Sequence, residues 1–394
     1  MKHKILLFLF FFLTFSVTAQ QKNWTLSGYV SGMPSGILFS SNPESDWDFP
    51  SAEWQALLHN RLNFGWQMSE HFRFDAGMRN RFIAGSEMMI NPDAISFDTG
   101  LMNLSWNYFS TKNTVLNTTL DRLFLSFEKN NWKFQLGRQR INWGQTFVWN
   151  PNDIFNTYSF FDFDYPERPG CDAFRITYFH NATSSSEFAF SLNHENKITT
   201  ALLHRWNNNN VDYQFIAGLL TETDIVVGGA LTSDYNGLNF RTEFSYFHPI
   251  ADVKTQCIAS LPTTPIIAIS AGLDYIFSNS LMLQAEVLYN NVPSTNNGGL
   301  LALYSAPLSA KNLSISRWNI FANASYPFTP RLNGALSSMY FVDINSFFVG
   351  SSLDFSVAEN LDFSFIVQYF SSFGNSAAGN INVLMGFARL KYSF

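Results

Sequence analysis

Arginine recurs at every second position in several stretches of this sequence, and its guanidinium is the group best suited to act on solutes. The clearest run carries Arg73, Arg79 and Arg81 on one face of a strand, with phenylalanine, alanine and methionine at intervening positions. A guanidinium is permanently charged and has five N–H donors, so a row of them facing water attracts anions and binds polar groups. The predicted chemistry is electrostatic selection of solutes.

The same alternation assigns further charged residues to a water-filled interior. The complete predicted set of pore-lining residues is Arg61, Arg73, Asp75, Arg79, Arg81, Arg122, Arg138, Arg140, Arg175, Arg241, Glu243, Glu286 and Arg317. Basic residues outnumber acidic ones in this set, so we expect the interior to favour anions. The alternative is that arginines and acids on facing strands pair across a packed interior and block flow.

Residue constellations for catalysis or metal binding do not stand out. The histidines are scattered without the spacing of metal ligands, and no nucleophile elbow or phosphate-binding glycine loop has a convincing context. We therefore expect no enzyme activity, no cofactor and no metal site. His59, beside Arg61, is interpreted as polar lining. Cys171 and Cys257 are the only cysteines, and their pairing is left open.

The elements that position these charges are β-strands with one apolar face. From Trp54 to Trp66 the even positions are mostly apolar and the odd ones mostly polar. The two tryptophans lie roughly 30 Å apart in height on a tilted strand, which matches two interfacial aromatic girdles. A one-residue slip of the arginine strands would turn cations to lipid, at ~2–4 kcal/mol for each arginine near the midplane.

Composition favours the same fold class. Aromatic residues make up 17% and charged residues 14%, whereas soluble domains average about 25% charged residues. In a membrane barrel alternate residues face lipid and water, so the mean hydropathy of -0.03 is expected and the 42 phenylalanines become lipid-facing surface. A secreted β-sandwich or β-helix is the alternative.

Short turn signals alternate with longer connections, which predicts an all-β, antiparallel, up-and-down transmembrane barrel. With both termini on the periplasmic side, about 18 strands fit, with 16 as the fallback. Residues 101–117 are open between a separate hairpin and the extension of a long strand. A bulge at Gly137 would return Arg138 and Arg140 to the lumen, and the alternative is that the membrane simply ends there. The longer connections are expected at 31–52, 84–117, 142–170, 249–264, 291–313 and 372–380.

The chain ends carry targeting signals. Lys2 and Lys4 precede an apolar run, so residues 1–19 are predicted to be a cleaved signal peptide and residues 20–394 a single barrel domain. Without those two lysines, 22 basic residues face 30 acidic ones, a net charge of about -8, and nucleic acid is not an expected partner. The last strand ends in Tyr392 and Phe394, resembling the signal that outer-membrane barrels present to the barrel-assembly machinery.

The connection 142–170 is unusual for a loop because it is rich in aromatic residues. So many exposed rings would form a large apolar patch in water. We expect this loop to fold into the bore and narrow it, or to form a platform for a sugar or an apolar solute. The alternative is that it packs against its neighbours for stability alone. The predicted constriction residues are Phe147, Trp149, Phe155, Tyr158, Phe161 and Phe163.

A short motif in this region resembles known barrels. The sequence GRQRINWG (Gly137 to Gly144), followed by NPNDIFN (Asn150 to Asn156), resembles the strand-and-loop signature of porin-like families that include the alginate-export type. That resemblance implies an eighteen-stranded barrel with a positively charged lumen. It implies Arg138 and Arg140 as lumen cations and 142–156 as a loop near the pore. The match covers about twenty residues, and alginate itself is not implied.

The function expected from these features is a porin-like channel of the outer membrane for small polar or anionic solutes or saccharides. Its expected partners are outer-membrane lipid and the barrel-assembly machinery, with a homotrimer or an envelope-complex partner left open. The first alternative is a non-conducting barrel that serves as scaffold, adhesin or complex subunit. The second is a barrel enzyme, for which His59 would be the residue to test.

Overall fold

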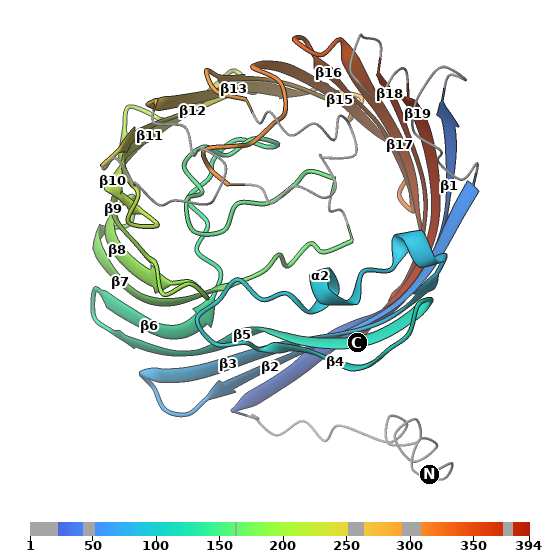
Figure 1. The fold of residues 1–394 in the computed structure, drawn as a ribbon. Helices are drawn as coiled ribbons and strands as arrows, with labels where there is room; N and C mark the ends of the chain where they lie inside the picture. Colours follow the sequence, from blue (N-terminus) through green and yellow to red (C-terminus); the bar gives the residue numbers. More distant parts are fainter. Residues whose placement is uncertain (1–22, 42–51, 162–163, 251–263, 294–308, 373–380) are drawn as a thin grey trace.

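The chain folds into a closed antiparallel β-barrel (Figure 1). The computed structural model describes residues 23–41, 52–161, 164–250, 264–293, 309–372 and 381–394. The strands are β1 Trp24–Ser41, β2 Ala52–Gln67, β3 Phe72–Gly85, β4 Ser105–Ser110, β5 Thr114–Lys129, β6 Trp132–Gln139, β7 Cys171–Asn181, β8 Ser184–Leu192, β9 Ile198–Asn208, β10 Val211–Leu220, β11 Asp224–Tyr235, β12 Leu238–Pro249, β13 Ile266–Ile276, β14 Met282–Asn290, β15 Trp318–Thr329, β16 Leu332–Phe341, β17 Ser346–Ala358, β18 Leu361–Ser372 and β19 Ile381–Ser393. The predicted signal peptide, residues 1–19, lies outside the described residues.

Eighteen of the 19 described strands form the circumference, and β4 is an addition to it. β1 pairs with both β2 and β19, which closes the cylinder. Two strands share one edge of β5: β4 pairs with its first part, up to Thr119, and β6 pairs with its second part, from Leu123 onward. Residues 101–117 therefore include a separate hairpin. The predicted number of 18 circumferential strands is confirmed, and the fallback of 16 is wrong.

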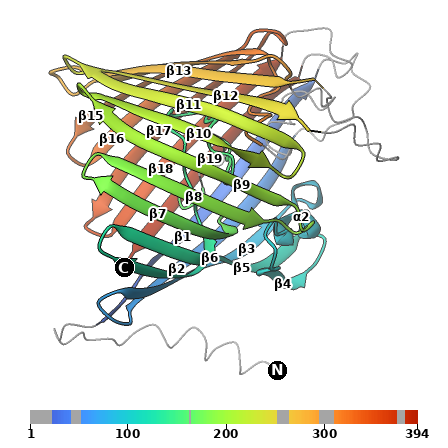
Figure 2. The same cartoon turned by 90° about the vertical axis from the view of Figure 1, so that its left-hand side faces the viewer.

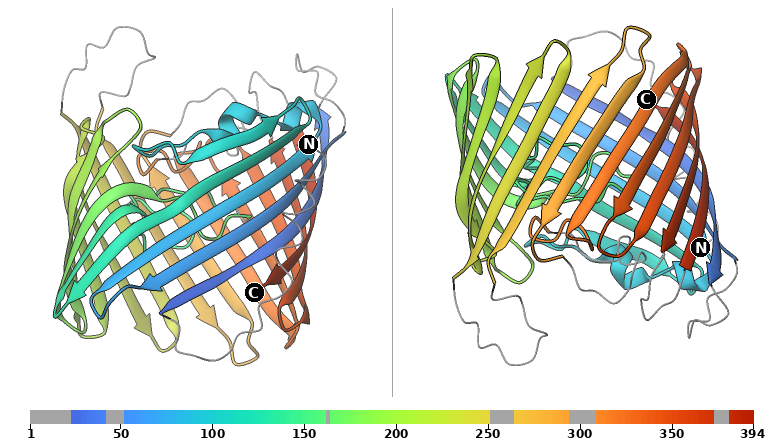
Figure 3. Two further views of the ribbon diagram at one scale, coloured as in Figure 1. Left: turned by 90° about the horizontal axis from the view of Figure 1, so that it is seen from below. Right: turned by 90° about the horizontal axis from the view of Figure 1, so that it is seen from above.

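The outer surface of the barrel is apolar. Trp54, Leu58 and Trp66 of β2 are 55%, 51% and 43% exposed, as their alternate spacing predicts. The strands are tilted around the cylinder (Figures 2 and 3), and exposed apolar side chains occur around the whole circumference. Such an exterior indicates contact with lipid hydrocarbon. The 3-10 helix η2 (Glu87–Met89) and helix α2 (Pro92–Ser96) are short, and no helix in the described ranges is long and apolar enough to cross a bilayer.

The interior is not uniformly polar, which corrects one expectation. Phe321, Phe341, Phe348 and Phe370 are almost fully buried inside the cylinder, although the phenylalanines were predicted to face lipid. They pack against chain that folds into the lumen, so their surroundings are those of a protein core. Alternation thus predicted the strands, but it could not distinguish a lumen face covered by protein from a face covered by lipid.

The two ends of the barrel differ in their connections. Short turns join β2 to β3, β5 to β6 and each following pair, and several hold a residue in the left-handed region, such as Asn130, Asn209 and Asn236. We call this the short-turn end; the opposite end, with longer connections, is the long-loop end. The predicted connection 31–52 was drawn too early, because β1 continues to Ser41.

The predicted bulge at Gly137 is wrong. β6 pairs with β5 and β7 without a register shift, and Gly137 instead has φ +119°, a backbone conformation that a side chain would strain. A real shift lies on the other edge of β5, where Gly77 pairs with Arg122 and Met78 with Leu120. The extra residue is Asp121, which is buried beside Arg61.

The outward position of Leu202 gives a test of the lipid face. Leu202 is 59% exposed on β9, well away from the short turns. We expect Leu202→Arg to lower the free energy of unfolding in phospholipid vesicles by ~2–4 kcal/mol, because a cation would enter hydrocarbon. Denaturant titration followed by tryptophan fluorescence measures this. The matched control is Asn333→Arg, an exposed position that lines an interior cavity. An equal loss in both variants would contradict the assigned faces.

Candidate functional site

The segment between β6 and β7, residues 140–170, leaves the wall and crosses the barrel interior (Figure 1). It packs on two sides. Val148, Trp149 and Phe161 join an apolar cluster with residues of β1 and β14–β19. Ile141, Trp143 and Ile154 join a second cluster, with residues of β7–β13. The two clusters hold the loop between opposite walls, in the half of the barrel nearer the long-loop end.

Two buried carboxylates of the wall fix the near arm of this loop. Glu243 on β12 accepts hydrogen bonds from the backbone N–H groups of Gln145, Thr146 (2.7 Å) and Asn152 (3.0 Å). The Oγ of Ser245, also on β12, donates to the Pro151 carbonyl at 2.9 Å. The carboxylate of Glu243 thus serves as the hydrogen-bond acceptor for loop N–H groups that have no neighbouring strand to pair with.

Glu286 on β14 does the same for the next stretch. Its carboxylate accepts from the N–H groups of Phe147 (2.8 Å), Val148 (3.2 Å) and Trp149 (2.8 Å), and from the hydroxyl of Ser270 (2.9 Å). Glu286 is 1% exposed. The N–H donors around this carboxylate offset part of the cost of burying it, and the donors are satisfied in return.

Local turns shape the loop between these anchors. Gly144 packs directly on Asn150, and a Cβ added to it would lie 2.3 Å from Asn150 Oδ1, so only glycine fits. The hydroxyl of Thr146 donates to the carbonyl of Trp149 at 2.5 Å. Asp153 accepts from the N–H of Trp143 at 3.3 Å, and its Oδ2 has no hydrogen-bond partner among the described residues. The motif that resembles porin-like families therefore includes the turn residues of this loop.

Burial raises the pKa of Asp153 to about 8. The Trp143 N–H, Arg140 and Arg168 partly offset this effect of burial, and the nearby carboxylate of Glu243 contributes to the raised pKa. A charged carboxylate at this place is poorly hydrated, so the docked loop favours the protonated acid. The docked loop therefore binds a proton at neutral pH.

The far arm of the loop is attached to β2, β3 and β5 through charges. The Tyr165 hydroxyl and the Arg61 guanidinium both donate to Asp121. Arg79 lies 3.9 Å from the centre of the Tyr165 ring and 3.3 Å from Asp164. Because these side chains come from the wall and from the loop, the far arm is anchored by an ionic cluster.

Two further wall residues bind this arm. Arg122 donates to the backbone carbonyls of Glu167 (2.5 Å) and Arg168 (3.0 Å). The Tyr29 hydroxyl of β1 donates to the Glu167 carboxylate at 3.1 Å. These contacts fasten the loop to β1, β2, β3, β5, β12 and β14. Trp143 also bonds to Glu187 of β8 and Gln214 of β10, and Asn152 bonds to Gly229 of β11.

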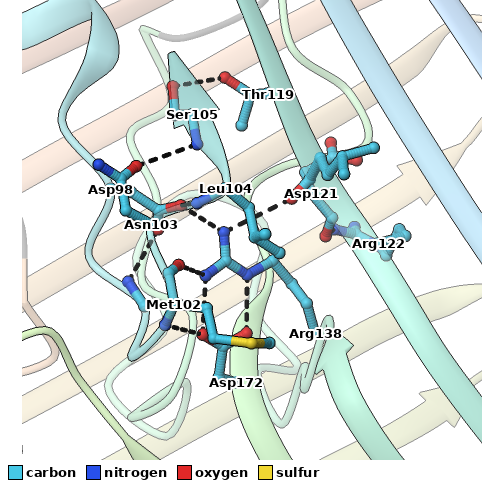
Figure 4. A network of polar contacts seen from close by, with 12 residues as sticks. Asp98, Met102, Asn103, Leu104, Ser105, Thr119, Asp121, Arg122, Arg138 and Asp172 are labelled. Carbon is cyan, nitrogen blue, oxygen red and sulfur yellow. Dashed lines mark hydrogen bonds and ion pairs between the residues drawn. The ribbon is translucent and has the colours of Figure 1, made fainter.

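Arg138, at the end of β6, ties three segments together (Figure 4). Its guanidinium pairs with Asp98 at 2.5 Å and Asp172 at 2.7 Å, and it donates to the Met102 carbonyl at 2.6 Å. Arg138 is 2% exposed. This cluster joins β6 and β7 to the segment that leads into β4. It lies at the point where the loop 140–170 leaves the wall of the barrel.

The other predicted pore-lining residues occupy varied settings. Arg175 pairs with Glu187 at 2.5 Å, Arg241 with Asp274 at 3.5 Å and Arg73 with Asp75 at 2.7 Å. Arg81 donates to Asn117 and to the Ile95 carbonyl, and Arg140 lies near the Tyr158 ring. Arg317 is exposed, just before β15 and outside the strands.

The predicted constriction residues lie inside the barrel where they are described. Trp149 and Phe161 are buried in the first cluster, with Phe147 packed against it, and Phe155 packs against the second. Arg168 lies over the Tyr158 ring. Phe163 lies outside the described residues, as does Cys257; Cys171 carries a free thiol.

Several interior residues were missed by sequence reasoning. The acids Asp98, Asp121, Asp164, Glu187 and Asp274 all face arginines. Two of these acids, Asp98 and Asp164, lie in connections, where alternation carries no signal. Asp121 is displaced by the bulge. A second connection also enters the barrel: Ala310, Leu313 and Ile315 are buried in the two apolar clusters, and nothing in their local pattern marked them.

Open space remains on the polar side of the lumen. A cavity of about 310 Å³ is lined by Gln145, Arg205, Asp212, Gln214 and Thr232 among others. Another, of about 240 Å³, is lined by Asn333, Asp354, Arg389 and Lys391 among others. Both involve residues at the short-turn end. Arg205, also missed, donates its Nε to the neutral amide of Gln214 at 2.8 Å.

The histidine considered for catalysis is part of the loop anchor. His59 is fully buried between Arg79, whose Nε lies 3.3 Å from its Nε2, and Asp164, 3.7 Å from its Nδ1. Tyr29 packs edge-on against its ring. Within the described ranges no group of three or more histidine, cysteine, aspartate or glutamate side chains could hold a metal ion.

No protein-family model matches the chain, and no curated protein matches it in sequence. Its fold resembles solved structures of Occ/Opd outer-membrane porins. OccK5 (OpdH) of Pseudomonas aeruginosa superposes with TM-score 0.57 at 8% identity, over 94% of this chain and 98% of that one. OpdL of Pseudomonas aeruginosa gives 0.56 at 11%, over 94% and 98%, and OccAB1 of Acinetobacter baumannii 0.55 at 10%, over 94% and 97%. These likenesses establish the barrel fold. The alginate-export resemblance gains no support from a family model or a curated relative.

Removing the Glu286 carboxylate should loosen the loop. We expect Glu286→Ala to raise hydrogen exchange of the Phe147, Val148 and Trp149 amides by at least about tenfold, because buried donors left without an acceptor cost ~1–3 kcal/mol each. Exchange mass spectrometry of the folded barrel measures this. Glu286→Gln, which keeps one acceptor oxygen, should fall between. The control Asp354→Ala removes an acid bonded to Ser364. Unchanged exchange in Glu286→Ala would contradict the anchoring role.

Loop docking should also depend on pH through Asp153. Its pKa in the docked loop, about 8, exceeds the ordinary 3.8. Since the docked form binds the extra proton, this contribution to docking is complete below about pH 4, decreases as pH rises, and is gone above about pH 8. We expect the protection factor of the Trp143 amide, which is its exchange rate corrected for base-catalysed intrinsic exchange, to fall over that range in the wild type. In Asp153→Asn, which cannot ionise, this fall in the protection factor should vanish; its persistence would mean that another group titrates.

Proposed function

We propose that this chain is an outer-membrane porin-type channel for small polar solutes, with the loop 140–170 as its constriction. The observation that carries the proposal is a loop held across the lumen by buried wall carboxylates, above polar cavities that extend toward the short-turn end. A loop fastened to several strands keeps a fixed cross-section, which is what size selection needs. The likeness to Occ/Opd porins supports the same function.

The membrane setting rests on the outer surface. Large apolar side chains cover the exterior of a closed barrel, and exposing so extensive an apolar face to water would be unfavourable. A cleaved signal peptide at residues 1–19 would deliver the chain across the inner membrane. Tyr392 and Phe394 would serve as the assembly signal: both are exposed, and Phe394 pairs through its backbone with Gly28 across the seam of the barrel.

The charge of the lumen favours anions only moderately in this proposal. Most of the predicted pore arginines have a carboxylate partner, so their fields largely cancel at a distance. Glu243 and Glu286 face N–H donors, which offset their charge. The cations that remain near open space include Arg205, which binds a neutral amide, and Lys391, which lies 4.3 Å from the Tyr29 ring centre. Polar and anionic solutes or saccharides are the proposed cargo.

A second candidate is a non-conducting barrel that acts as a scaffold or a subunit of an envelope complex. Two apolar clusters and a second inserted connection, residues 309–317, fill much of the barrel near the long-loop end. A lumen packed in this way could be closed to solutes. The distinction lies in whether the polar cavities connect past the loop.

Planar-bilayer recording of the purified protein separates the two candidates. We expect discrete conductance steps and a reversal potential shifted moderately toward anions in a salt gradient. Replacement of residues 147–161 by a short glycine-serine linker should raise conductance severalfold, because the constriction is removed. Wild-type protein without openings, combined with openings in the shortened variant, would favour the closed barrel. Equal conductance in both proteins would show that the loop does not limit flow.

A further inference from the structure

On the outer surface, near the short-turn end, polar side chains interrupt the apolar exterior of β7–β9. Ser186 lies between two imidazoles, with its Oγ 2.8 Å from His180 Nε2 and 2.9 Å from His204 Nδ1. The two rings are 5.6 Å apart. We call these three residues the His-Ser-His cluster. It lies outside the lumen and takes no part in holding the loop.

Strand pairing places this cluster on the lipid side. Ser186 pairs directly with His204 and with Tyr178, so these three side chains share one face. The next outward positions along β8 and β9 are Phe188 and Leu202, both exposed apolar residues. The intervening positions, such as Glu187 and Leu203, are buried on the inner face.

A bulge in β7 brings the second histidine to the cluster. Phe179 pairs with Ser185 and Asn181 with Ser184, which leaves His180 unopposed. A bulge bends the strand and redirects its extra side chain, and here the His180 ring meets the Ser186 hydroxyl. The serine has one hydrogen and can donate to only one imidazole, so the other imidazole donates to it. Each ring keeps its second nitrogen for a further partner.

Aromatic residues flank the cluster on both sides. Trp206 stacks on His204 with a ring separation of 5.4 Å and on Tyr213 at 5.3 Å. Tyr178 lies edge-on to His180 at 4.9 Å and contacts Trp132 at 4.6 Å. Amphipathic rings of this kind gather where hydrocarbon gives way to headgroups. The cluster is close in sequence to the short turns joining β7 to β8 and β9 to β10, so we infer that it lies at headgroup level. Figure 2 shows these strands on one side of the barrel.

We propose that the His-Ser-His cluster and its flanking tyrosines bind the phosphate of a membrane phospholipid. The imidazole that accepts from Ser186 has its N–H on the second nitrogen, and this N–H and the tyrosine hydroxyls are donors suited to a phosphate oxygen. The apolar surface of Phe188 and Leu202 would receive the acyl chains. A phospholipid fits both halves, because the donors continue directly into the apolar band. The proposal depends on the membrane setting of the proposed function but not on conduction.

Lipid retention by the detergent-purified barrel tests this. Native mass spectrometry would compare phosphatidylglycerol with diacylglycerol of the same acyl chains. We expect wild-type protein to retain phosphatidylglycerol in preference to diacylglycerol. His180→Phe/His204→Phe keeps the ring stacking but loses the imidazole donor, and should weaken phosphatidylglycerol retention about tenfold, as the loss of one hydrogen bond to a charged phosphate predicts. Diacylglycerol retention should stay unchanged.

The matched control is His248→Phe. His248 is an exposed residue of β12 at the opposite end of the barrel, with its Nδ1 3.1 Å from the Tyr246 hydroxyl. This variant should retain phosphatidylglycerol like the wild type, and excess inorganic phosphate should not displace the lipid. Equal retention of both lipids by the wild type, unchanged retention in the double variant, an equal loss in His248→Phe, or displacement by free phosphate would each overturn the proposal.

A gel-mobility shift between heated and unheated samples establishes that every variant is a folded barrel. The readout separates this inference from the proposed function. Openings in a planar bilayer with no lipid preference would overturn the lipid site alone, whereas a clear lipid preference without openings would leave the site in place and count against the channel.

Discussion

Buried backbone N–H groups need acceptors, and this constraint governs the interior of the barrel. A loop that crosses the lumen cannot pair with a strand along its length, so its donors must find side chains or water. Glu243 and Glu286 supply acceptors for six of these N–H groups, three each. Each carboxylate is in turn stabilised by its donors. Loop and wall acids are therefore buried together, and neither arrangement is stable without the other.

This pairing alters the electrostatics of the lumen. The sequence pattern places Glu243 and Glu286 in a water-filled bore, but both accept hydrogen bonds from the loop. Arginines on the opposite wall pair with acids of the loop and of the strands, such as Asp164 and Asp121. The loop thus supplies N–H donors to the wall acids and carboxylates to the wall arginines. The charges that remain lie on the polar side between the loop and the short turns, where Arg205 faces open space.

The strands could be predicted from the sequence because lipid imposes a simple rule on every second residue. That rule gave the outward face of β2, the short turns and the eighteen-strand circumference. It failed where a residue is covered by protein. Phe341 and Phe370 read as lipid-facing by type, yet they lie under the loop. Asp98 and Asp164 had no pattern at all, because the connections that carry them follow contacts distant in sequence.

The same limit explains why the interior has two zones. Near the long-loop end, inserted chain covers the wall, so apolar side chains can face inward at no cost in hydration. Near the short turns, connections of two to five residues insert no chain, and the wall faces open space with serine, asparagine and charged residues. Inserted chain therefore determines wall polarity: a position of the same strand accepts phenylalanine or arginine according to whether protein or water lies opposite. In this barrel, the inserted loops determine which part of the cylinder is a protein core and which part is an open, polar space.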